Sequence, residues 1–219
     1  MREPSIHVLA IDSASSLPAV ALHCAGRLLE ERLPDDRRAS EELLPAIVRL
    51  LAAADVFLSD CGRIAVCAGP GSFTGVRVGM ATAWGLGRAL ALPVESLSTL
   101  EALAEAARAP GLAGVTAVLD AGRGEVVLQQ FLFPENAPRV QMVGDPERLP
   151  LALAADRLRG GDVAALPEDL LGSSRRPLAR SPAAAAALAV ARAPRAVPAA
   201  APAAIYARPS AAEDKLGAP

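Results

Sequence analysis

Residues 69–77 read Gly-Pro-Gly-Ser-Phe-Thr-Gly-Val-Arg, a glycine-rich turn between two regular elements. The apolar run 63–68 before it predicts a buried strand, and the residues from about Val76 to Leu90 after it have helical spacing. Many proteins bind nucleotide phosphates where a strand turns into a helix in this way. The spacing of the glycines therefore bears directly on function.

That spacing fits neither of the two common phosphate-binding loops. A P-loop needs a lysine after its second glycine, and no lysine follows this turn. In a Rossmann turn the third glycine would stand one residue earlier than Gly75, although Glu95 stands about where that fold has its ribose-binding acid. A strand-to-helix turn with an exposed aromatic residue, Phe73, is the better interpretation, and a Rossmann-type site is the weaker alternative.

The residues before this turn predict an antiparallel meander and a helix. Residues 6–11 and 19–24 read as apolar strands, and the more polar run 27–33 reads as a third strand toward the edge of a sheet. Apolar residues at helical spacing then predict a helix from Ser40 to Ala54, whose first turn Pro45 should bend.

The second half of the chain opens like the first. After a Pro-Gly break at 110–111, an apolar strand ends in Asp120, a glycine-rich turn follows, and residues 125–133 read as the returning strand. This repetition predicts two lobes, residues 1–109 and 110–219. The second is expected to be degenerate and to end in an Ala/Pro-rich tail that is partly disordered or extended.

Two strand ends carry an acid followed by small residues. Asp12, Ser13 and Ser15 follow the first strand, and Asp120 follows its counterpart in the second half. Backbone amides in such turns can face a phosphate. The alternative is that Asp12 and the serines satisfy the backbone groups of the turn itself, which the residues favour when taken alone.

Composition argues against several other functions. The chain has 22 basic and 24 acidic residues and 3% aromatic residues, so it has neither the charge nor the stacking groups of a tight nucleic-acid binder. Its two histidines lie in predicted strands without metal-ligand or triad spacing. Three cysteines without a paired spacing predict reduced thiols, and no signal peptide or membrane span is evident, so we expect a cytoplasmic protein.

The helix after the glycine-rich turn carries small residues on one face. Gly79, Ala83 and Gly87 recur every four residues, so another helix can approach closely there. The approaching helix could be the chain's own, residues 40–54, or it could belong to another subunit. Both interpretations stay open on the residues alone.

Four segments, taken together, resemble the TsaB family in order and spacing: residues 11–15, 40–45, 69–79 and 120–126. Residues 205–208 look like that family's closing segment. The resemblance implies a two-lobed actin-like (ribonuclease H-like) α/β fold, in which each lobe has a mixed sheet that opens with an antiparallel meander and is flanked by helices.

The resemblance also implies a role. Family members are non-catalytic subunits of the bacterial complex that makes N6-threonylcarbamoyladenosine (t6A) in tRNA; they dock on the transferase TsaD, and the ATPase TsaE joins them. By this resemblance the chain is a homodimer when alone and reaches tRNA only through the complex. The lone subunit binds no cofactor, and any ATP or ADP would be held at the interface with TsaD.

The implied docking surface comprises the first two helices of the N-terminal lobe. It gives the following interface residues: Glu41, Leu44, Val48, Leu51, Phe73, Arg77, Gly79, Ala83 and Gly87. On this expectation Ala83→Leu should block the heterodimer. The family often has a histidine where Ala39 stands, so no role of that histidine carries over.

Two other functions of the same superfamily can be weighed on the residues. The catalytic relative needs a histidine pair for its metal, which this chain lacks. A small-molecule kinase or ATPase is the alternative function, motivated by Asp12 and Asp120 at paired strand ends.

Overall fold

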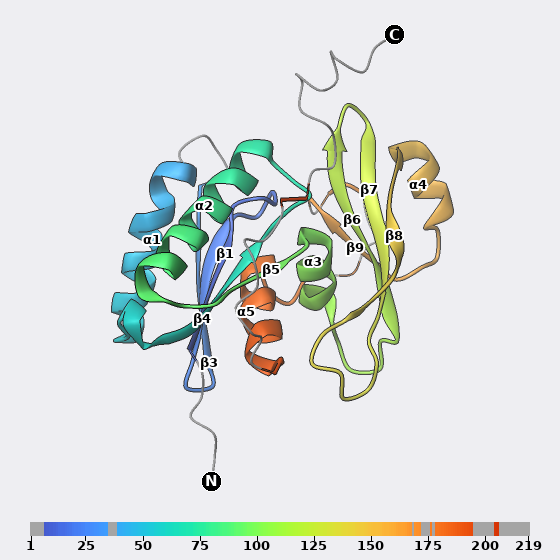
Figure 1. Cartoon of the computed structure of the whole chain (residues 1–219). Coiled ribbons are helices and arrows are strands. Elements are labelled where there is room, and N and C mark those ends of the chain that lie inside the picture. Colours follow the sequence, from blue (N-terminus) through green and yellow to red (C-terminus); the bar gives the residue numbers. More distant parts are fainter. Residues whose placement is uncertain are drawn as a thin grey trace.

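The chain folds around two β-sheets that lie on either side of two central helices (Figure 1). The computed structural model describes residues 7–34, 39–167, 169–171, 176, 178–194 and 204–205. In this part of the chain the layers are, in order, α1 with α2, the first sheet, α3 with α5, the second sheet, and α4.

The first sheet has five strands in the order β3-β2-β1-β4-β5. The first three strands form the predicted antiparallel meander, and β4 and β5 run parallel to β1. The central strands β1 and β4 are apolar and buried on both faces, as strands covered by helices on each side must be. The strands are β1 His7–Asp12, β2 Ala19–Cys24, β3 Arg27–Arg32, β4 Cys61–Cys67 and β5 Val94–Leu97.

The second sheet has four strands in the order β8-β7-β6-β9 and repeats this pattern. Its first three strands are again an antiparallel meander, and β9 runs parallel to β6. The strands are β6 Gly114–Gly122, β7 Glu125–Leu132, β8 Gln141–Pro150 and β9 Val163–Leu166. The two-lobed α/β fold with a mixed sheet in each lobe is therefore confirmed.

Serine side chains begin three of the helices. Ser72, Ser98 and Ser181 each accept a hydrogen bond from the backbone N–H three residues on, which satisfies a donor that the helix leaves free. For this reason α2 begins at Phe73, three residues before its predicted start. The helices are α1 Ala39–Ala54, the 3-10 turn η1 Leu58–Asp60, α2 Phe73–Leu90, α3 Thr99–Ala107, α4 Leu151–Arg157 and α5 Pro182–Arg192. In the described residues no helix is both long and apolar enough to cross a bilayer.

Helix α5 returns from the second half of the chain to the first sheet. Its alanines are buried against the side chains of β1, β2 and β4 that face away from α1 and α2. Residues 110–219 are therefore not confined to the second lobe. The predicted boundary after residue 109 separates the two sets of duplicated strands. It assigns α5 to the second lobe, however, whereas this helix packs on the first sheet.

Charged groups of the first lobe hold both ends of α5. At its N-terminus, Ser181 donates its hydroxyl to Glu30 at 2.9 Å. At its C-terminus, the buried guanidinium of Arg63 donates to the carbonyls of Val190 and Ala193 at 2.9 and 3.0 Å. An acid at the start and a base at the end of a helix both complement its dipole. Each interaction stabilises α5 on the first sheet.

Candidate functional site

The turn after β1 uses its polar groups internally. Asp12 is fully buried, and one carboxylate oxygen accepts the N–H groups of Ala14 and Ser15 at 2.9 and 3.1 Å. Its other oxygen accepts the Ser15 hydroxyl. The Ser13 hydroxyl donates to the carbonyl of Gly75 at 2.7 Å. The amides of Ala14 and Ser15 and the hydroxyls of Ser13 and Ser15 are therefore bonded within the chain. The buried Ser16 hydroxyl oxygen, by contrast, has no hydrogen-bond partner in the described part of the chain.

The glycines of segment 69–79 make room for this same turn. A Cβ atom at Gly71 would lie 2.7 Å from the carbonyl carbon of Ala14, and one at Gly75 would lie 2.8 Å from that of Ser13. At Gly79 it would lie 2.5 Å from the Ser13 hydroxyl oxygen. Real Cβ atoms essentially never approach other atoms so closely. The missing side chains thus let α2 and its preceding loop pack on the turn after β1.

A cleft of about 280 Å³ lies where the strand-end turns of the two lobes face each other. Ser15 and Asp120 line it, whereas Asp12 and Ser13 are not among its lining residues. Asp120 is exposed and accepts the N–H of Gly122 at 2.7 Å. The full lining is Ala14, Ser15, Ser16, Gly71, Ser72, Leu119, Asp120, Leu166 and Pro167.

This cleft is poorly suited to a nucleotide phosphate. Among the described residues that line it, Asp120 is the one that can carry a charge, and its carboxylate would repel an anion. The volume also lies just below the roughly 300–1,000 Å³ of typical small-molecule sites. The second interpretation of the turn, in which Asp12 and the serines satisfy local backbone groups, agrees with this geometry.

The Asp12 carboxylate lies in a buried, hydrogen-bonded environment that shifts its pKa. Burial raises the pKa of Asp12, while the hydrogen bonds from Ser15 and Ala14 act in the opposite direction.

We expect Asp12→Asn to keep the free energy of unfolding within about 1 kcal/mol, because its amide oxygen can still accept both N–H groups. Asp12→Ala leaves those buried donors unpaired and should cost about 2–4 kcal/mol. Urea unfolding of the two variants checks this; an Asp12→Ala variant as stable as the wild type would contradict it.

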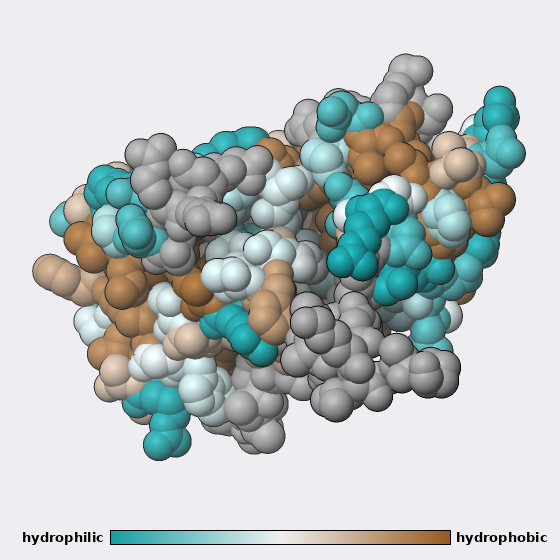
Figure 2. Space-filling model, turned by 90° about the horizontal axis from the view of Figure 1, so that it is seen from above, coloured by the Kyte–Doolittle hydropathy of each residue, from teal (hydrophilic) through white to brown (hydrophobic). Residues whose placement is uncertain are grey.

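Five of the nine predicted interface residues lie at the surface. Leu44 and Val48 on α1 are 53% and 66% exposed, and Glu41 is exposed in the first turn of the same helix. On α2, Phe73 is 38% exposed, and the Arg77 guanidinium stacks on its ring at 3.8 Å. Figure 2 shows apolar groups at the surface of the lobe that carries these helices.

The remaining four predicted interface residues pack inward. Gly79 faces Ser13 and Ile11 of the strand-end turn, and Ala83 is fully buried between α2 and the first sheet. Gly87 lies against Val94 of β5, and Leu51 is 8% exposed within the same core. The small-residue face of α2 therefore packs on the chain's own first sheet.

Two cleft residues, Leu166 and Pro167, had no signal in the sequence; they line the cleft from the end of β9. Ser16, which also lines it, belongs to the serine-rich turn that follows Asp12. Strand β9 has four residues in an alanine-rich region, where neither strand periodicity nor a turn motif is evident. Within the closing segment 205–208 that resembles the family, residues 206–208 lie outside the described residues.

Comparison with known proteins extends these observations. A family model described as TsaD, tRNA N6-adenosine threonylcarbamoyltransferase, matches residues 35–137. The tRNA threonylcarbamoyladenosine biosynthesis protein TsaB of Escherichia coli is 36% identical over 60% of this chain, and that of Bacillus subtilis is 35% identical over 63%. The matches span 57% and 60% of those two proteins, less than two thirds of their length.

A solved structure, YeaZ from Pseudomonas aeruginosa, is 35% identical. It superimposes with a TM-score of 0.61 over 66% of this chain and 68% of its own. The fold and the internally bonded turn define a two-lobed α/β protein with a mixed sheet in each lobe, in which the Asp12 side chain binds the amides of the turn after the first strand. The chain belongs to the TsaB/YeaZ family.

Proposed function

We propose that this chain is a non-catalytic subunit in the biosynthesis of tRNA threonylcarbamoyladenosine, and that it docks on a TsaD-type transferase. Membership of the family supports the pathway, because the E. coli, Haemophilus influenzae and B. subtilis relatives carry that function in their names. The Asp12 turn, whose polar groups are bonded internally, supports the non-catalytic role.

The observation that carries the docking surface is the exposure of two large apolar side chains on α1. Leu44 and Val48 lie one helical turn apart on the face that points away from the core. On α2, which contacts α1, Phe73 and Arg77 in the first turns add an aromatic group and a base, two residue kinds that are enriched in interfaces. We propose these four residues with Glu41 as the contact surface for the transferase, with TsaE joining the pair, and for a second copy of the chain in isolation.

A pair of matched substitutions tests this surface. Val48→Asp should weaken the heterodimer with the transferase of the same organism at least about tenfold, because a desolvated carboxylate would replace an apolar contact. Leu153→Asp on α4 is the control, since Leu153 is 61% exposed on the opposite outer layer. Size-exclusion chromatography and titration calorimetry measure both. Equal affinities for the two variants would place the contact elsewhere.

The proposal also predicts how the isolated chain behaves with nucleotide. We expect no heat of Mg-ATP binding at micromolar concentrations, because Asp12 already binds the Ala14 and Ser15 amides and the cleft offers a carboxylate. Titration calorimetry on the lone chain and on the heterodimer checks this. Binding seen only with the heterodimer would place the nucleotide at the interface, whereas micromolar binding by the lone chain would favour a kinase or ATPase.

A further inference from the structure

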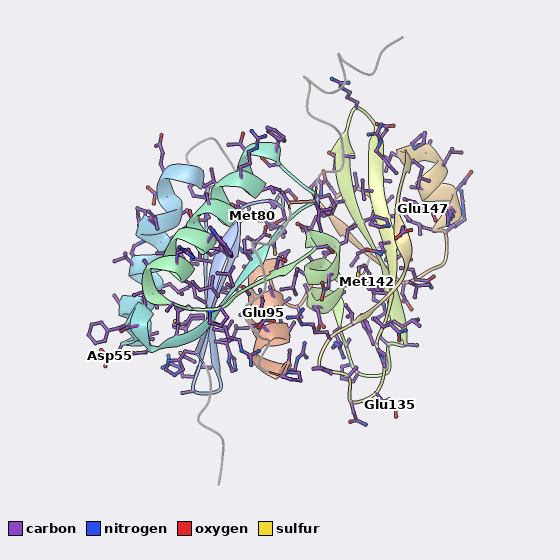
Figure 3. All side chains as sticks on the ribbon, viewed as in Figure 1. Asp55, Met80, Glu95, Glu135, Met142 and Glu147 are labelled. Atoms are coloured by element: carbon purple, nitrogen blue, oxygen red, sulfur yellow. The ribbon has the colours of Figure 1, made fainter. Side chains whose placement is uncertain are left out.

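Two arginine side chains join the lobes on the side of the central helices that lies away from the cleft. Arg139 donates to the carboxylate of Glu95 at 2.6 Å, and Arg192 donates to that of Glu105 at 2.7 Å. Glu95 stands near the start of β5, whereas the cleft lies at the ends of β1 and β4. Figure 3 shows Glu95 in the middle of the molecule, beside α5.

In each pair the two partners pack on different sheets. Glu95 belongs to β5 of the first sheet, and Arg139 lies in the connection that leads from β7 to β8 of the second. Arg192 ends α5, which packs on the first sheet, and Glu105 lies on α3, most of whose apolar side chains pack on the second sheet while Ala102 packs with α5. Rotation of one lobe against the other would pull both pairs apart.

The acidic partners are buried (Glu105) or largely buried (Glu95) and are held in place by further donors. The Glu105 side chain is 1% exposed and also accepts from Arg108 at 3.1 Å and from the N–H of Val140 at 2.8 Å. The Glu95 side chain is 12% exposed and also accepts from Arg63 at 3.3 Å. Partly stripping a buried carboxylate of its partners is costly, because water does not reach it to replace them.

We propose that these two ion pairs lock the lobes in one relative orientation, so that the cleft does not open and close. Many two-lobed proteins close around a ligand by rotating about a hinge opposite the cleft. Here the segment where such a hinge would lie is bridged by Arg139 and Arg192, while the N–H of Val140 holds the Glu105 carboxylate in place within the second lobe. The protein presents its surfaces as one rigid body.

A double variant with a matched control tests the lock. Arg139→Gln with Arg192→Gln removes both pairs while Glu95 and Glu105 keep their donors Arg63 and Arg108. The control, Arg49→Gln with Arg157→Gln, removes the same charge from pairs that lie within single lobes. Both arginines of the lock are partly exposed, at 27% and 40%, so the variant should fold.

Spin labels on introduced cysteines at exposed Thr74 and Leu153 report the distance between the lobes, because the native cysteines are buried. We expect one distance in the wild type and the control, and a second, longer distance in the lock variant. Amide exchange at Val140 should also become about tenfold faster in that variant. Several distances in the wild type, or a lock variant that matches the control in both measurements, would overturn the proposal.

Discussion

Gly75→Ala is expected to destabilise the protein by about 3 kcal/mol or more, the largest effect of any single methyl group in α2. The added Cβ would lie 2.8 Å from the carbonyl carbon of Ser13 and closer still to its oxygen. Both are backbone atoms of the turn that Asp12 holds, so neither can move aside without breaking the hydrogen bond from Ser13 to Gly75.

Gly85→Ala is the matched control for this substitution. Gly85 is exposed on the same helix, and a Cβ atom there would meet nothing within 4 Å. This variant should be neutral or more stable by about 0.5–1 kcal/mol, because alanine favours the helical backbone. Urea unfolding of both variants gives the comparison. If both glycines tolerate alanine equally, the glycine-rich segment has a role other than close packing.

Arg63→Met should cost about 3–5 kcal/mol. The Arg63 side chain is 2% exposed, and its guanidinium serves the C-terminal carbonyls of α5 as well as Glu95. Methionine fills similar space but leaves those buried acceptors without a donor. Because the substitution removes the hydrogen bonds at the C-terminal end of α5, amide exchange in residues 182–192 should accelerate more than exchange in β6 and β7.

Arg49→Met is the control for Arg63→Met. Arg49 has an exposed side chain and pairs with Glu31 and Glu42 on the surface of the first lobe. Its loss should leave the urea midpoint almost unchanged, since solvent screens such pairs. Equal destabilisation by the two substitutions would show that Arg63 contributes little beyond its charge.

The sequence predicted the elements of this fold better than the contacts between them. Apolar runs that end in Asp12 and Asp120 were sufficient to predict both meanders, because strand periodicity is a local property. Helical spacing showed that Gly79, Ala83 and Gly87 share a face. Spacing alone cannot show what that face contacts, and the structure places it against the first sheet.

The residues of the candidate site could be predicted from the sequence, but whether their turn binds phosphate or bonds to itself could not. Asp12, Ser13 and Ser15 stood out as a turn that could bind phosphate or bond to itself. The glycines that settle how the turn packs lie about 60 residues away, as the separation of 62 between Ser13 and Gly75 shows. The pair of Glu105 with Arg192, 87 residues apart, had no local signal.

The return of α5 to the first sheet affects the order in which the protein can be completed during synthesis. Arg63 and the carbonyl of Val190 are 127 residues apart in the chain. At about 5–20 residues per second, a ribosome needs roughly 6–25 s to make that interval. Until α5 is made, the face of the first sheet that its alanines cover is exposed. A nascent chain of residues 1–109 is therefore an incomplete lobe, and we expect it to need protection from aggregation until α5 is made.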